Sequence, residues 1–102
     1  MVRWMRKAQV APGKFIEAMG FATEIAAYVK KFEGLPPVQV FVDSFGDMTT
    51  FRWVVDYEDL GAMEKVNTQM MSDQEYFKKV DSSGHVFIPG TVKDTVMRLI
   101  ET

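Results

Sequence analysis

Two side chains stand out as candidates for chemistry, Arg52 and His85. Arg52 lies between Phe51 and Trp53, and its planar guanidinium could bind a carboxylate, phenolate or enolate oxygen. His85 is the only histidine, and an imidazole titrates near neutral pH and can transfer protons. Both also have an ordinary explanation, because Arg52 could pair with an acidic side chain and His85 could be a solvent-exposed loop residue. The sequence therefore gives two catalytic candidates and leaves both alternatives open.

Several other kinds of site lack the residues that they need. The chain has no cysteine, which excludes disulfides, thiolate nucleophiles and Cys-ligated metals. The acidic run Asp56, Glu58 and Asp59 is explained by helix capping, so we expect no metal site. A single histidine without a placed acidic partner argues against a catalytic triad. The net charge of −2 gives no basic field, so we expect no nucleic-acid partner.

The spacing of apolar side chains predicts the elements that position these candidates. Helical spacing runs from Phe15 to Phe32, and Gly34 with Pro36 stops it. The tetrad 72–75, "SDQE", has the form of a capping box. The predicted elements are a strand at 2–10, a helix at 14–33, strands at 38–43 and 48–55, a helix capped by Asp56, a short helix at 73–80 and a strand at 91–100. This βαββαβ order predicts one domain over residues 1–102 with an α+β, ferredoxin-like fold, in which a four-stranded antiparallel sheet carries its helices on one face.

The hairpin loop "SFGD" decides which side chains share a face of the sheet. With a four-residue loop, Asp43 lies opposite Met48 and Gln39 lies opposite Arg52. In this register the strongly apolar face of the hairpin, which includes Trp53, packs against the helices. Arg52 lies on the opposite face. Which face of the strand 2–10 lines a cavity stays open, because both of its faces carry charge. The candidates for ligand contact are therefore the neighbours of Arg52 on its face and a tryptophan of the first strand: Gln39, Phe41, Thr50 and Trp4.

The sheet face that carries Arg52 has no predicted helix above it. Phe41 and Val54 make this face partly apolar, and exposed apolar patches often mark association. We therefore predict a homodimer through this open sheet face, with a cavity enclosed between the two sheets. Arg52 would then be enclosed by the second chain rather than exposed to water.

Two stretches of the sequence resemble a known superfamily. The segment 10–19, "VAPGKFIEAM", resembles the strand-end, Pro-Gly-Lys, helix-start motif of the dimeric α+β barrel proteins, and 51–80, "FRWVVDYEDLGAMEKVNTQMMSDQEYFKKV", resembles their NIPSNAP branch. The resemblance implies a ferredoxin-like subunit that dimerises into a barrel. Members of the superfamily include cofactor-free monooxygenases, haem-degrading enzymes, polyketide cyclases, lactone isomerases and proteins without an assigned activity. The first strand lacks the asparagine of the haem-degrading members, so we expect no haem and no other cofactor.

Two functions remain open at this point. The first is a cofactor-free enzyme, such as a monooxygenase, cyclase or isomerase, that acts on a small apolar or aromatic molecule. The second is a non-catalytic module that binds a small molecule or another protein. The N-terminus lacks the continuous apolar stretch of a signal peptide, and no apolar run approaches the ~20 residues of a membrane span, so we expect a cytoplasmic protein.

Overall fold

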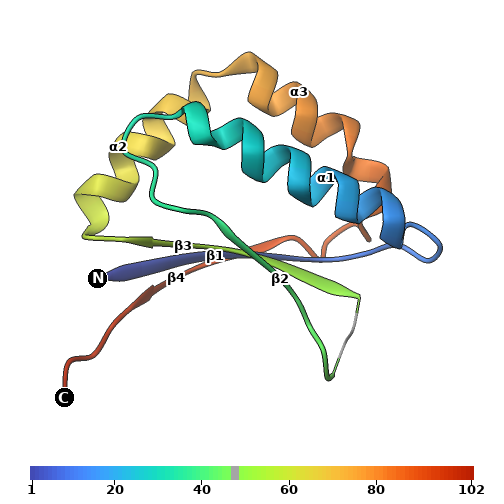
Figure 1. The fold of residues 1–102 in the computed structure, drawn as a ribbon, viewed down its shortest axis with the longest axis horizontal. Coiled ribbons are helices and arrows are strands. Elements are labelled where there is room, and N and C mark those ends of the chain that lie inside the picture. Colours follow the sequence, from blue (N-terminus) through green and yellow to red (C-terminus); the bar gives the residue numbers. More distant parts are fainter. Residues whose placement is uncertain (47–48) are drawn as a thin grey trace.

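A computed structural model of the chain describes residues 1–46 and 49–102. Its elements are the strands β1 (Val2–Gln9), β2 (Gln39–Val42), β3 (Thr50–Tyr57) and β4 (Lys93–Arg98), the helices α1 (Phe15–Tyr28), α2 (Leu60–Met71) and α3 (Gln74–Ser82), and the short 3-10 helices η1 (Val29–Lys31) and η2 (Gly84–Val86). The strands form one antiparallel sheet in the order β2-β3-β1-β4. Figure 1 shows the three α-helices on one face of this sheet and none on the other. The predicted α+β, ferredoxin-like arrangement is confirmed.

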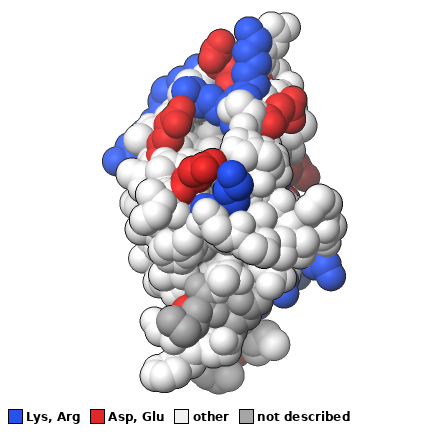
Figure 2. Space-filling model, turned by 90° about the vertical axis from the view of Figure 1, so that its right-hand side faces the viewer, with Lys and Arg blue, Asp and Glu red and all other residues white. Residues whose placement is uncertain are grey.

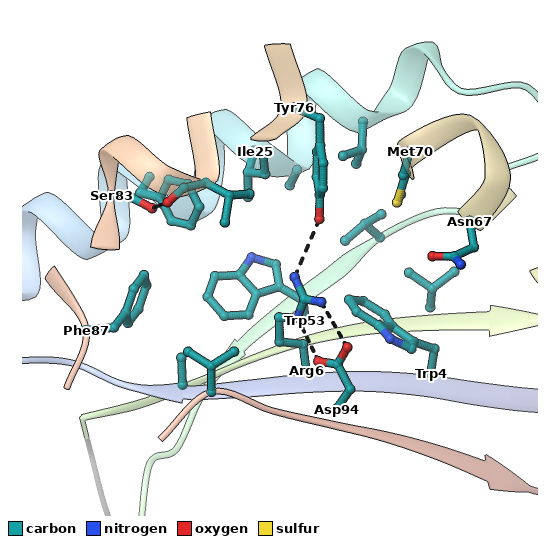
Figure 3. Close-up of a pocket in the computed structure, with 18 of the residues that line it drawn as sticks. Trp4, Arg6, Ile25, Trp53, Asn67, Met70, Tyr76, Ser83, Phe87 and Asp94 are labelled. Carbon is teal, nitrogen blue, oxygen red and sulfur yellow. Dashed lines mark hydrogen bonds and ion pairs between the residues drawn. The ribbon is translucent and has the colours of Figure 1, made fainter. Parts of the chain in front are cut away.

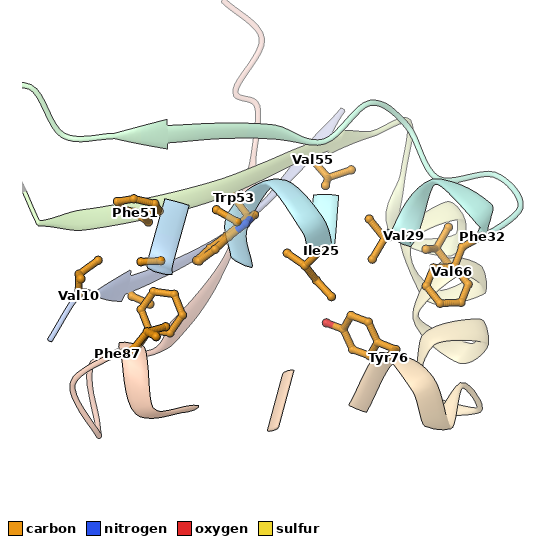
Figure 4. Close-up of a cluster of buried hydrophobic side chains, with 14 of the residues drawn as sticks. Val10, Ile25, Val29, Phe32, Phe51, Trp53, Val55, Val66, Tyr76 and Phe87 are labelled. Carbon is orange, nitrogen blue, oxygen red and sulfur yellow. The ribbon is translucent and has the colours of Figure 1, made fainter. Parts of the chain in front are cut away.

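The core lies between the sheet and the helices (Figure 4). Helix α1 buries Ala18, Ala22 and Ile25, which recur at the three- to four-residue spacing of one helical face. On the sheet, Phe51 and Trp53 are buried beneath the helices, as the pattern predicted. Edge-to-face contacts between aromatic rings fill the space between the two layers, and such contacts stabilise a core beyond the burial of their area.

The pairing of β2 with β3 differs from the predicted register by two residues. Arg52 lies opposite Phe41, and Gln39 lies opposite Val54. The pairing closes at the hydrogen bond from the Asp43 N–H to the Thr50 carbonyl, so the loop is longer than four residues. Because side chains alternate with a period of two, this shift keeps every side chain on its predicted face and changes only its neighbours. The predicted position of Met48 lies outside the described residues.

The start of α2 also differs from the prediction. Asp56 is a residue of β3 and its carboxylate accepts hydrogen bonds from Arg3, at 2.7 and 3.0 Å. The N-cap is Asp59, whose Oδ1 accepts a hydrogen bond from the Ala62 N–H at 2.8 Å. The strand therefore continues to Tyr57, which is buried and packs in the core. A buried aromatic side chain at that position extends the sheet past the first acidic residue.

Helix α3 begins one residue later than a cap at Ser72 would require. Asp73 is its N-cap, and its Oδ1 accepts a hydrogen bond from the Tyr76 N–H at 2.8 Å. The Ser72 hydroxyl instead donates to the carbonyl of Thr68, at the end of the preceding helix. The helix continues to Ser82, two residues past its predicted end at 80.

Candidate functional site

A cavity of about 430 Å³ lies between the helices and the sheet (Figure 3). Side chains from both layers line it, and most of them are aromatic or aliphatic, including Trp4, Trp53, Tyr76, Met70 and Phe87. Two charged side chains, Arg6 and Asp94, lie among these apolar walls. Ligand sites typically have roughly 300–1,000 Å³ of mostly apolar volume with a few polar groups that fix orientation. The cavity has these properties.

Strand β1 positions the polar centre of the cavity. In the sheet, Arg6 lies between Trp53 of β3 and Asp94 of β4. The alternation along β1 places Trp4 and Arg6 on the same face as the buried Ala8, which is the face under the helices. The face of the first strand that remained open from the sequence is thereby assigned.

The guanidinium of Arg6 is held by two neighbours. Its Nε donates to Asp94 Oδ1 at 2.7 Å and its Nη2 donates to Asp94 Oδ2 at 2.9 Å, which is a bidentate ion pair. It also lies over the ring of Trp4, 5.4 Å from the ring centroid. The hydrogen bonds to Asp94 raise the pKa of Arg6 although its burial opposes the shift, so this side chain keeps its positive charge.

The ion pair with Asp94 leaves hydrogen-bond donors on Arg6. A guanidinium has five N–H groups, and the bidentate pair uses one on Nε and one on Nη2. The Nη1 atom is 3.5 Å from the Tyr76 hydroxyl, which is a long and weak contact. Figure 3 shows the guanidinium between the rings of Trp4 and Trp53, with the Tyr76 hydroxyl directed toward it from α3. The remaining donors are therefore placed where an oxygen atom of a bound molecule could accept from them.

The sequence-predicted candidates divide between the two faces of the sheet. Trp4 lines the cavity. Arg52 lies on the opposite face of β3, where its Nε and Nη2 donate to the two carboxylate oxygens of Asp43 at 2.9 and 3.2 Å. Phe41 lies directly across from it and is 49% exposed, and Gln39 also faces away from the helices. Thr50 is buried at the base of the hairpin.

His85 lies on η2 at the surface. Its side chain is 60% exposed, and its Nε2 is 3.0 Å from Glu17 Oε2. This hydrogen bond, together with Lys14, lowers the pKa of the Glu17 carboxyl. Arg52 and His85 are both absent from the lining of the described cavity, so the structure does not bring them together there. Their catalytic roles stay predictions.

The sequence reasoning missed the charged pair of this cavity. One signal for Arg6 was present, because the small apolar residues Val2, Ala8 and Val10 share its face of the first strand. For Asp94 no signal was available, since β4 brings it to Arg6 from 88 residues away. Only the sheet topology reveals that the two charges neutralise each other.

The described residues also bear on metal binding, membrane insertion and surface charge. They contain no group of three or more acidic, histidine or cysteine side chains that could hold a metal ion. Within this part of the chain, no helix is long and apolar enough to cross a membrane. On the face in Figure 2, basic and acidic side chains alternate over the helices above a largely uncharged area, without a continuous basic surface.

Comparisons with known proteins add the fold family. No protein-family model matches the chain, and no curated protein matches it significantly. Among solved structures, an uncharacterised NIPSNAP-like domain protein from Burkholderia xenovorans aligns with a TM-score of 0.77 at 11% identity, over 97% of this chain and 84% of that one. A NIPSNAP family protein from Agrobacterium tumefaciens aligns with a TM-score of 0.73 at 16% identity, over 99% and 92%. A candidate antibiotic biosynthesis monooxygenase from Deinococcus radiodurans aligns with a TM-score of 0.75 at 17% identity, over 100% and 95%.

These structural neighbours are NIPSNAP-family proteins and monooxygenase-like proteins of ferredoxin-like fold, as the sequence resemblance predicted. The similarity is one of fold, because all three sequence identities are far too low to transfer an activity. The function must therefore be argued from the residues of the cavity.

Proposed function

We propose that this protein binds a flat, largely apolar molecule in the cavity between its helices and its sheet, and that Arg6 binds an oxygen atom of that molecule. The observation that carries this proposal is the Arg6 guanidinium, which keeps unused N–H donors inside an aromatic cavity of about 430 Å³. A group of this kind gives orientation and specificity to a ligand that apolar walls hold by burial.

The charge of the site favours an uncharged ligand. Arg6 and Asp94 together carry no net charge, and Asp94 lines the same cavity. A carboxylate ligand would be attracted by the guanidinium and repelled by the adjacent carboxylate. A carbonyl or phenol oxygen would accept a hydrogen bond from Arg6 without that repulsion. The ligand class is therefore a neutral aromatic ketone, quinone or phenol.

One reaction fits this geometry. Arg6 and the Tyr76 hydroxyl could stabilise the negative charge that develops on a carbonyl oxygen when a neighbouring C–H gives its proton to the Asp94 carboxylate. Molecular oxygen could then oxidise the activated CH₂ to a carbonyl, with one oxygen atom entering the product and the other leaving as water. The structural neighbour named for antibiotic biosynthesis supports testing this cofactor-free oxygenation first.

A second function, binding without catalysis, is favoured by the state of Asp94. Both oxygens of this carboxylate accept hydrogen bonds from Arg6, which weakens it as a base. Among the described residues that line the cavity, it is the only carboxylate, and His85 lies outside. In this case the protein would carry or sense its ligand.

The two tryptophans of the chain report directly on the cavity, because both line it. We expect 1-tetralone, a bicyclic aromatic ketone, to change the tryptophan fluorescence in a saturable manner. Arg6→Met should weaken this binding about tenfold or more, since it removes a charged hydrogen-bond donor. Asp94, 43% exposed, would remain solvated in this variant, so the fold should survive.

Arg3→Met is the matched control. Arg3 is on the same strand and makes an equivalent bidentate pair with Asp56, but it lies on the opposite face of the sheet. Equal loss of binding in both variants, or no response of the wild-type fluorescence, would contradict the proposal. Oxygen uptake with an activated aromatic CH₂ compound such as anthrone then separates the two functions: uptake lost in Arg6→Met supports the oxygenase, and binding without uptake supports the carrier.

We also propose that the open sheet face pairs with a second copy of the chain. Phe41 and Met97 are exposed apolar side chains on this face, and two of its charged residues, Arg3 and Arg52, are already paired with acids of their own chain. Lys7 and Lys93 share this face and have no ion pair among the described residues. Burial of such a face would leave few charges uncompensated.

A further inference from the structure

The indole N–H of Trp53 has no hydrogen-bond partner among the described residues, although it is fully buried. The whole side chain is 6% exposed. Buried tryptophan N–H groups usually find an acceptor, and one that does not calls for an explanation. The environment of Trp53 provides that explanation.

The groups around Trp53 offer donors or rings. Arg6, its neighbour across the strand pair, has only N–H donors. Phe21 and Phe87 meet its ring edge-to-face, with centroids 6.3 and 5.9 Å away. The nearby carboxylate of Asp94 already accepts two hydrogen bonds from Arg6. This part of the site therefore has more donors than acceptors.

The ring of Trp53 forms part of the cavity wall. Trp53 lines it together with Arg6 and Tyr76, so strands β1 and β3 and helix α3 all bring polar groups to one space. Figure 3 shows the indole nitrogen on the ring edge that faces the helices, on the side of Ile25. A bound molecule is the natural source of the missing acceptor.

We propose that Trp53 is a specificity-determining residue whose Nε1–H binds a second acceptor oxygen of the ligand, in addition to the oxygen held by Arg6. The inference rests on the proposed function in that it takes this cavity as the binding site. It narrows the ligand class to flat aromatic molecules with two carbonyl-type oxygens, such as quinones or aromatic diketones. A carbonyl suits this site best, because it accepts hydrogen bonds and brings no additional donor next to Arg6 and Trp53.

Three probes of similar size and shape test this inference: naphthalene has no acceptor oxygen, 1-tetralone has one and 1,4-naphthoquinone has two. The chain has no cysteine, so the quinone meets no thiol that it could alkylate. With ¹⁵N-labelled protein, the two tryptophans give two indole N–H signals, which the Trp4→Phe variant assigns. Titrations give the affinity of each probe and the response of each indole proton.

We expect the affinity to rise from naphthalene to 1-tetralone to 1,4-naphthoquinone, by roughly three- to tenfold for each hydrogen bond gained. The indole proton of Trp53 should move downfield with the quinone by more than with 1-tetralone or naphthalene. Trp53→Phe keeps an aromatic ring and removes the N–H, so it should abolish the preference for the quinone over 1-tetralone. If this variant does not fold, the indole signal of the wild-type protein still decides the question.

Two results separate failure of this inference from failure of the proposed function. If the quinone and 1-tetralone bind equally and binding still depends on Arg6, the cavity is a ligand site and the role of Trp53 is wrong. The same conclusion follows if the chemical shift of the Trp53 indole proton does not change when the quinone binds. An N–H directed at a neighbouring aromatic ring would behave in this way. If none of the three probes binds, both proposals are wrong.

Discussion

At the scale of single residues, Asp73 is a carboxylate outside the cavity whose pKa is strongly lowered by its neighbours. Its oxygens accept hydrogen bonds from the Tyr28 hydroxyl at 2.8 Å and from the Tyr76 N–H at 2.8 Å, and Lys31 Nζ is 2.5 Å away. The hydrogen bond with Lys31, followed by that with the Tyr76 N–H, lowers the pKa of this carboxyl to about 2. One side chain thus caps α3 and ties it to the end of α1.

Asp73→Asn should therefore reduce stability in a pH-dependent way. The pKa of Asp73 is depressed in the folded state, so the ionised carboxylate stabilises the protein above the unfolded pKa of about 3.9. This contribution is lost as the pH falls toward about 2, where the folded-state carboxyl takes up its proton. We expect the variant to have the lower Tm at pH 7 and the difference to shrink below pH 4. Thermal unfolding followed by circular dichroism measures it, and a difference that persists unchanged at pH 2–3 would show that the charge is irrelevant.

The same scale explains why the charged centre of the cavity was harder to predict than the fold. Arg52 drew attention because two aromatic neighbours flank it in sequence, yet the cavity contains Arg6. A charged side chain on the core side of a sheet is costly without a partner, and here the acid that pairs with Arg6 comes from the last strand. Sequence reasoning sees the neighbours of a residue along the chain, whereas this charge depends on a neighbour across the sheet.

At the scale of elements, periodicity predicted the faces correctly and the boundaries less well. The two-residue error in the β2–β3 register left Arg52 and Trp53 on their expected sides, because a strand repeats every two residues. The helix boundary was different, since Asp56 and Asp59 lie three residues apart and both are residues that commonly cap a helix. Propensity alone could not distinguish them, and the burial of Tyr57 in β3 decided the outcome.

The position of the cap gives a testable consequence. Asp59→Ala removes the acceptor for the Ala62 N–H and should lower the free energy of unfolding by about 1 kcal/mol. Asp56→Ala breaks only a partly exposed ion pair with Arg3 and should have the smaller effect. Urea unfolding of both variants provides the comparison. A larger loss for Asp56→Ala would mean that α2 begins earlier in solution than it does here.

At the scale of the whole molecule, the proposed ligand site and the proposed dimer interface lie on opposite faces of the sheet. The helix-covered face encloses the cavity, whereas the other face is bare in Figure 1. The bare face carries exposed Phe41, and its arginines are paired within the chain. A substitution on the bare face should therefore alter dimerisation and leave ligand binding in the cavity unchanged.

Phe41→Lys tests that separation. A lysine at this half-exposed position would place an uncompensated charge in an interface between two open faces, so the wild-type protein should be a dimer and the variant a monomer. Ile16→Lys is the control, because Ile16 is also an exposed apolar residue, 83% accessible, but belongs to α1 in the other layer. Light scattering at micromolar concentration should give the dimer mass for the wild type and for Ile16→Lys. Binding of 1-tetralone should persist in the Phe41→Lys monomer, since the cavity is formed within one chain, and a wild-type monomer or an unchanged mass for Phe41→Lys would exclude pairing through this face.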